Sequence, residues 1–137
     1  MSPHDTALGP LGRAELRRRR DALERSAPAA VSVGQLCSPD DLDAAVSDLA
    51  DAVPVGERLA FVEHVGRVGL AGRAQALADP LWSRFGGGCH VDRDVPAALR
   101  RGGFLVTDLE RFTMPTAIAV LRPWVQGTAV RIEADAT

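Results

Sequence analysis

Apolar and polar positions alternate along this 137-residue chain in blocks that predict strands and helices in turn. Short apolar runs, which are typical of buried strands, occupy residues 29–36 and 58–65. Two later runs, at 104–112 and 126–134, predict two more strands. No helical pattern lies between these last two runs, so we expect them to pair antiparallel.

The first predicted helix spans residues 13–25, where Leu16 and Leu23 form a thin apolar stripe. Its four consecutive arginines, Arg17–Arg20, fit either a solvated helix face or a docking patch for an acidic partner or a phosphate, and we favour the solvated face. Residues 1–12 contain two prolines and two glycines, which predicts a mobile arm.

Two further helices follow from spacing and capping residues. Ser38 is the predicted N-cap of one helix, which ends near Val53 before a Pro and a Gly. Its apolar face is predicted to consist of Leu42, Val46, Leu49 and Val53. The last helix covers residues 95–101, with Asp94 as its cap and Gly102-Gly103 at its end.

This order of elements predicts an α/β fold with a mostly parallel sheet of about four strands, the last one antiparallel, and flanking helices. The length suits one domain. We therefore divide the chain into an arm (1–12), an Arg-rich helix (13–28) and one α/β unit (29–137).

Composition narrows the class of protein. Apolar residues make up 46% and charged residues 25%, and the net charge is -2, so no global field favours nucleic acid or an anionic membrane. Two cysteines do not make a secreted disulfide scaffold. The N-terminus lacks the pattern of a signal peptide, and no apolar stretch reaches the ~20 residues that span a bilayer. We expect a cytoplasmic protein.

Four segments resemble class I S-adenosylmethionine-dependent methyltransferases. RLAFVEHV is similar to the "G-G-x-L-x-F-x-E-H" of the fifth strand in that family, and VGQLCSPDDLDAAVSDLADAVPVGERL resembles its fourth strand and following helix. DPLWSRFGGGCHVDRDVPAALRRGGF and ERFTMPTAIAVLRPWVQGTAVR resemble later motifs of the ubiquinone-methyltransferase-like and thiol-methyltransferase-like branch. Trp124 replaces the histidine of the "R-P-H-x-x-G-x-A" end. The resemblance covers residues 29–132 and implies a truncated Rossmann-like half-sheet.

The resemblance also implies what is missing. The family holds its cofactor with a Gly-rich loop after strand one and an acidic residue at the end of strand two. The 28 residues before Ala29 contain neither feature, so we expect the isolated chain to bind no S-adenosylmethionine without a complementary half. Strand 29–36 would then be an open edge. A second copy, a separate protein or the Arg-rich helix could cover it, and we expect a homodimer.

Candidate site residues lie where open α/β sheets bind ligands, at the carboxyl ends of strands. Glu63 and His64 end the strand 58–65, and His64 could act as a general base that Glu63 orients. A structural, hydrogen-bonded pair is an equal alternative. The resemblance places Leu36 and Cys37 beside the cofactor. Cys37 fits a small buried residue better than a reactive thiol.

Cys89 and His90 follow three glycines, in a loop that the resemblance places on the substrate side. His90 is a candidate catalytic group and Cys89 a candidate pocket residue, although a structural role fits both better. Two such ligands do not complete a zinc site, so we expect no metal. Trp124 is predicted to pack in the core or to line the pocket.

Three functions fit these residues. The first is a methyltransferase-like protein that has lost independent cofactor binding and acts as a dimeric small-molecule-binding protein or a cofactor-free biosynthetic enzyme. The second is the substrate-side subunit of a split methyltransferase. The third is a non-enzymatic interaction module that docks through Arg17–Arg20.

Overall fold

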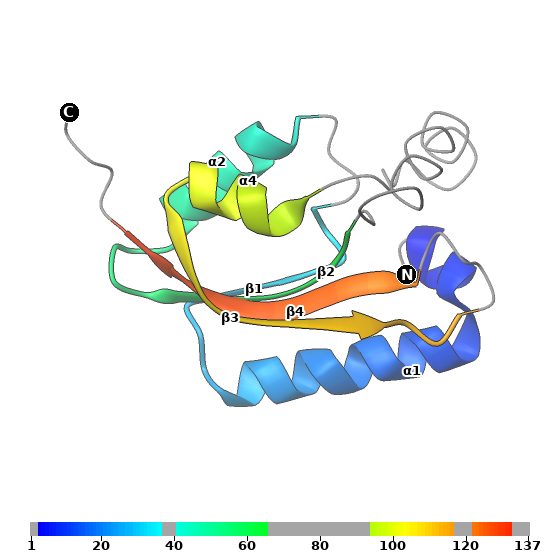
Figure 1. Ribbon diagram of the computed structural model, residues 1–137. Helices are drawn as coiled ribbons and strands as arrows, with labels where there is room; N and C mark the ends of the chain where they lie inside the picture. The colour runs from blue at the N-terminus through cyan, green and yellow to red at the C-terminus, as the bar shows by residue number, and fades with distance from the viewer. Residues whose placement is uncertain (1–2, 37–40, 66–93, 117–121, 133–137) are drawn as a thin grey trace.

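The computed structural model describes residues 3–36, 41–65, 94–116 and 122–132, and within them it has three helices and four strands. Along the chain the elements are α1 (Pro3–Arg25), β1 (Ala30–Val33), α2 (Leu42–Ala52), β2 (Arg58–His64), α4 (Val95–Arg101), β3 (Phe104–Thr113) and β4 (Pro123–Arg131). Figure 1 shows one sheet between two helical layers, with α2 and α4 on one face and α1 on the other.

The four strands lie in the order β1-β2-β4-β3. β1 pairs parallel with β2, whereas β4 pairs antiparallel with both β2 and β3. The last strand therefore inserts between its two neighbours and runs against all the others. The prediction of an α/β half-sheet with an antiparallel last strand is confirmed. The edge strands of this sheet are β1 and β3.

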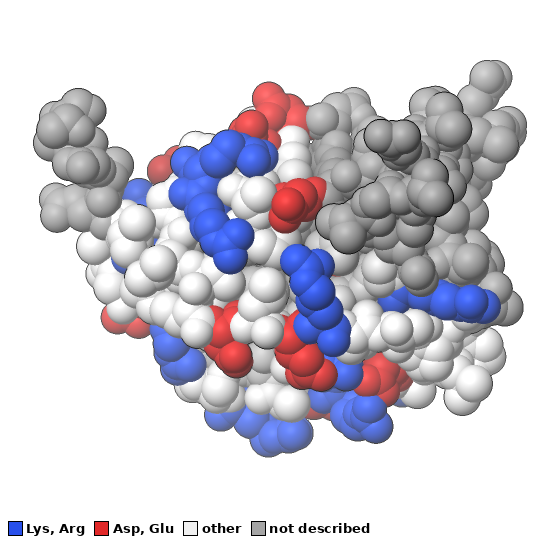
Figure 2. Space-filling model, viewed as in Figure 1, with Lys and Arg blue, Asp and Glu red and all other residues white. Residues whose placement is uncertain are grey.

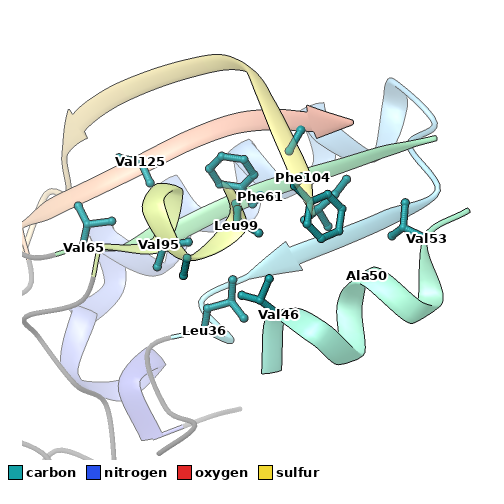
Figure 3. Close-up of a cluster of buried hydrophobic side chains, with 13 residues drawn as sticks. Leu36, Val46, Ala50, Val53, Phe61, Val65, Val95, Leu99, Phe104 and Val125 are labelled. Carbon is teal, nitrogen blue, oxygen red and sulfur yellow. The ribbon is translucent and has the colours of Figure 1, made fainter. Parts of the chain in front are cut away.

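A cluster of apolar side chains forms the core of the face under α2 and α4. Phe61 and Leu99 point toward each other between the sheet and the helices, and Val46 joins them from α2 (Figure 3). All three are fully buried, with relative exposures of 0%. Burying a side chain of this size contributes about 1.5–3 kcal/mol, so this cluster fixes the position of β2.

The helix ends agree with the sequence at one helix and differ at another. Asp94 caps α4 as predicted, accepting the Ala97 N–H at 3.1 Å. In α2 the cap is Asp41, which accepts the Ala44 N–H at 3.0 Å, and not Ser38. Ser38 lies outside the described residues. The prediction of Ser38 was wrong because Asp41 offers the same short acceptor one turn later, immediately before the first helical residue.

The opposite face is covered by α1, which starts earlier than the sequence predicted. An arm was expected over residues 1–12, but the structure is helical from Pro3, with a break at Gly9 (φ 75°), just before Pro10. Leu8 anchors this early part, since it is 2% exposed and packs in the same cluster as Leu16. Apolar contact therefore orders a segment whose Pro and Gly content indicated a mobile arm.

β4 also begins three residues earlier than the predicted strand 126–134, at Pro123, and ends at Arg131. Pairing explains the difference. Trp124 lies opposite both His64 and Phe112, so the neighbouring strands extend β4 toward its N-terminal end. The predicted limits of β3 differ by one residue only.

Candidate functional site

The carboxyl ends of β1 and β2 lie side by side because these two strands are parallel. This end of the sheet holds Leu36 and Glu63, with His64 next along β2. Of the other predicted site residues, Trp124 is described, whereas Cys37, Cys89 and His90 lie outside the described residues.

Glu63 is fully buried at 0% exposure and makes three hydrogen bonds. The Ser32 hydroxyl donates to its Oε1 at 2.6 Å, and the Gln35 N–H donates to the same oxygen at 3.2 Å. The Leu36 N–H donates to Oε2 at 3.1 Å. One carboxyl group therefore ties the end of β2 to β1 and to the backbone that follows β1.

Burial raises the pKa of Glu63 to about 7, because the charged form loses its hydration. The hydrogen bonds from Ser32, Leu36 and Gln35 lower the pKa and offset part of this effect. Glu63 therefore changes its proton content near neutral pH, which is unusual for a carboxyl group.

His64 is 1% exposed and faces the opposite side of the sheet from Glu63. Its ring lies edge-on to Trp124, with ring centroids 5.9 Å apart and an angle of 65° between the planes. Trp124 in turn lies 6.5 Å from Phe112. The imidazole thus belongs to the aromatic cluster under α1.

The interpretation of Glu63 as the group that orients His64 does not survive this geometry. Successive residues of a strand point to opposite faces, and these two do so here. Phe61, which shares the face of Glu63, packs with α2 and α4, whereas Val62 and Trp124 pack on the α1 side. Glu63 and His64 therefore do not form a pair.

Leu36 and Trp124 are both core residues. Leu36 is 3% exposed in the cluster under α2 and α4, and Trp124 is 2% exposed in the cluster under α1. Of the two roles open to Trp124, packing in the core matches this burial. The backbone of Leu36, through its bond to Glu63, is the part that belongs to the site.

Sequence reasoning missed Ser32. It interrupts an apolar strand, is 0% exposed and donates to Glu63. A signal was present, since a polar residue inside a buried run needs a hydrogen-bonding partner. Strand pairing supplies it: Ser32 lies opposite Phe61, which is two residues before Glu63 and on the same face.

The four arginines Arg17–Arg20 differ in exposure to solvent. Arg17, Arg18 and Arg20 are exposed, and basic and acidic side chains are interspersed over the layer formed by α1 (Figure 2). Arg19 instead packs on the sheet, with its Cζ 3.5 Å from the Phe112 ring centroid. Its position, three residues after Leu16 and four before Leu23, places it on the buried face of the helix.

Arg19 also has polar partners. Its guanidinium donates to Gln126 Oε1 at 2.7 Å and to Glu15 Oε1 at 2.7 Å, and it lies 3.6 Å from Glu110 Oε2. These contacts fasten α1 to β3 and β4. Arg19 is thus a structural residue, and only its three neighbours face solvent.

The described residues contain no group of three or more His, Cys, Asp or Glu side chains placed to hold a metal ion. They also contain no helix long and apolar enough to cross a membrane.

Comparison with solved structures identifies the fold. The crystal structure of the [4+2]-cyclase SpnF superimposes with a TM-score of 0.54 at 16% identity, over 77% of this chain and 50% of that one. A putative hemolysin from Streptococcus thermophilus gives 0.43 at 16% identity, covering 78% and 36%. M1.HpyAVI gives 0.36 at 12% identity, covering 86% and 51%.

Neither the protein-family models nor the curated proteins gave a match. The present chain spans half the length of SpnF, and identities this low speak for fold alone. The strand order, the antiparallel last strand and the SpnF superposition together give the chain an α/β half-sheet that resembles methyltransferase-fold proteins.

Proposed function

We propose that this chain is a methyltransferase-like protein that does not bind S-adenosylmethionine by itself. It acts as a dimer whose two sheets join at β1, and it binds a small molecule near the carboxyl ends of β1 and β2. The observation that carries the proposal is the position of β1 at an edge of the sheet.

The backbone of β1 is suited to pairing. The Gly34 N–H donates to the Val62 carbonyl at 2.9 Å, toward β2, in register with the pairing of Val33 and Val62. Because backbone groups alternate sides along a strand, those of Val31 and Val33 face away from β2. The strand carries no charge and pairs with β2 without a register shift, and such an edge is a template for another strand. A two-fold axis beside β1 would join two copies into one continuous sheet.

The donors near the end of β1 support the absence of independent cofactor binding. Backbone N–H groups in such a position are natural partners for a ligand. Those of Gln35 and Leu36 already donate to Glu63. These two groups are therefore not available to S-adenosylmethionine in this conformation.

Binding has more support than acid–base catalysis. Glu63 and His64 are each at most 1% exposed and lie on opposite faces, so they cannot act together on one substrate atom. A cofactor-free enzyme would need other groups, and His90 is the remaining candidate. SpnF is a [4+2]-cyclase, but the likeness to it concerns fold, so a cyclase activity is the less supported form of the proposal.

Sedimentation of Val31→Pro tests the dimer. Proline removes the outward N–H of Val31 and is tolerated on an edge strand, so it should disrupt pairing between copies while leaving the β1–β2 contact. We expect a dimer for the wild type at micromolar concentration and at least about a tenfold weaker association for Val31→Pro. Val31→Ala keeps the N–H and should remain dimeric. A wild type that is monomeric without a partner would refute the dimer.

A second candidate is the substrate-side half of a split methyltransferase. Coverage of only half of SpnF favours it, because the other half of such a fold could come from another chain. Calorimetry separates the two functions. The first predicts no heat of binding with S-adenosylmethionine under any mixture of copies of this chain, and the second predicts binding only after a complementary half is added.

A further inference from the structure

Glu63 connects two separate parts of the proposed ligand site. Its carboxyl group belongs to the end of β2, and its donors belong to β1 and to the segment 34–36 that follows it. Gly34, with φ 62°, turns the chain out of the strand at this point, and its N–H donates to the Val62 carbonyl at 2.9 Å. The bonds to Gln35 and Leu36 hold the backbone after that turn.

We infer that Glu63 is a positioning residue, which fixes the segment 34–36 beside the proposed ligand site and releases it when its carboxyl group ionises. The inference rests on the proposed function only in naming what the segment borders. Glu63 cannot touch a substrate in this conformation, because none of its surface is exposed. It acts through the backbone that it holds.

Proton linkage gives the direction. The pKa of Glu63 is about 7 while the carboxyl group is buried, and it returns toward its ordinary value of 4.5 once the segment opens and water reaches the group. The closed form therefore holds the proton more tightly than the open form. Rising pH between these two values favours opening, and falling pH favours closure.

The described surroundings contain no second charge that would reverse this direction. Ser32, Gln35 and Leu36 approach the carboxyl group as neutral donors, and His64 faces the other side of the sheet. On this face α2 and α4 contribute apolar side chains to the core. The described charged residues at the caps and along these two helices are all exposed: Asp41, Asp43, Asp48, Asp51, Asp94, Arg100 and Arg101.

Native-state amide hydrogen exchange of the whole chain tests the inference at Gln35 and Leu36. After correction for intrinsic exchange, we expect the opening constant of these two amides to rise about 10- to 40-fold from pH 5 to pH 7, and to level off above that range. In Glu63→Gln the constant should not depend on pH in this way. His64→Gln is the matched control, since it removes the adjacent titratable group on the other face and should keep the rise.

Ser32→Ala provides a second variant in case Glu63→Gln folds poorly. It leaves the carboxyl group but removes a donor that lowers its pKa, so the rise should level off at a higher pH. A wild-type constant that stays flat would overturn the inference. So would an unchanged rise in Glu63→Gln.

The exchange measurement tests the role of Glu63 separately from the proposed dimer. Repeating the measurement on Val31→Pro shows whether Glu63 holds the segment 34–36 without pairing at β1. If sedimentation finds no dimer but the rise at Gln35 and Leu36 persists, the dimer fails and the role of Glu63 stands. If the wild type is a dimer but exchange at Gln35 and Leu36 does not depend on pH, the dimer stands and the role of Glu63 fails.

Discussion

The two edges of the sheet are built differently, and the difference indicates which one accepts a partner. β1 has four residues, Ala-Val-Ser-Val, with no charge and no irregularity. β3 has ten residues, a register shift between Val106 and Asp108, and the charged side chains Asp108, Glu110 and Arg111. Charges and bulges are the means by which natural edge strands avoid pairing. β3 has both of these features, and β1, within the part of the chain that the structure describes, has neither.

Each edge is also attached to the rest of the molecule by one polar residue. At β1 this residue is Glu63, which is fully buried and bonded to neutral donors. At β3 it is Arg19, whose side chain is 18% exposed and has two carboxylate neighbours. The β1 attachment therefore depends on a carboxyl group whose pKa is raised to about 7, whereas the β3 attachment pairs a guanidinium group with carboxylates.

The largest effect on stability should follow from adding a side chain at Gly127, which lies beside the β3 bulge. A Cβ atom on Gly127 would overlap the Asp108 carbonyl oxygen and lie 2.9 Å from Phe61 Cζ. Gly127→Ala should therefore destabilise the fold by more than about 3 kcal/mol, because the backbone at the bulge must move. Denaturant unfolding measures this. Gly56→Ala is the control: it has φ 88° and open space, so about 1 kcal/mol of strain is expected.

The next effect is the pH dependence that Glu63 gives to global stability. Its pKa in the folded state, about 7, is above its ordinary value of 4.5, so its contribution is complete below pH 4.5 and is lost as pH rises to 7. The loss amounts to about 3 kcal/mol. Glu63→Gln should remove this part of the slope in urea unfolding series across that range. Parallel slopes for the two proteins would contradict the prediction.

The helix α4 and the residue Glu63 show what the sequence could predict and what it could not. Local signals placed α4 correctly, since Asp94, Gly102 and Gly103 act within one short segment. Strand alternation already implied that Glu63 and His64 diverge. The partners of Glu63 come from β1 and the segment that follows it, 27 to 31 positions earlier in the chain, and no local pattern specifies them.

The same reasoning applies to the ends of the elements. The helical start of α1 depends on Leu8 meeting the cluster under the sheet, which outweighs the local signals of Gly9 and Pro10. The antiparallel pairing of the last two strands was predicted, but the insertion of β4 between β2 and β3 was not. Capping and periodicity act locally, whereas pairing and burial depend on contacts between distant parts of the chain.

A smaller effect is expected at the attachment of β3. Arg19→Met removes the contact with the Phe112 ring and the hydrogen bonds to Gln126 and Glu15, while it keeps an unbranched apolar stem. We expect a loss of about 1–2 kcal/mol in denaturant unfolding. Arg18→Met is the matched control, because the Arg18 side chain is 73% exposed, and it should change stability by less than about 0.5 kcal/mol. Equal losses would show that Arg19 has no special role.

Removing the charges of β3 should change the free energy of unfolding least, by less than about 0.5 kcal/mol. The same change should increase association between copies. Glu110→Thr with Arg111→Thr keeps the net charge of -2 and leaves β3 with polar, strand-forming residues. Light scattering at increasing concentration should then detect species larger than those of the wild type, because the second edge can pair. Arg17→Ala with Asp21→Ala removes the same charges from the exposed side of α1 and should not associate further. If the β3 variant scatters no more than this control, the bulge alone protects β3, and the two edges differ in shape rather than in charge.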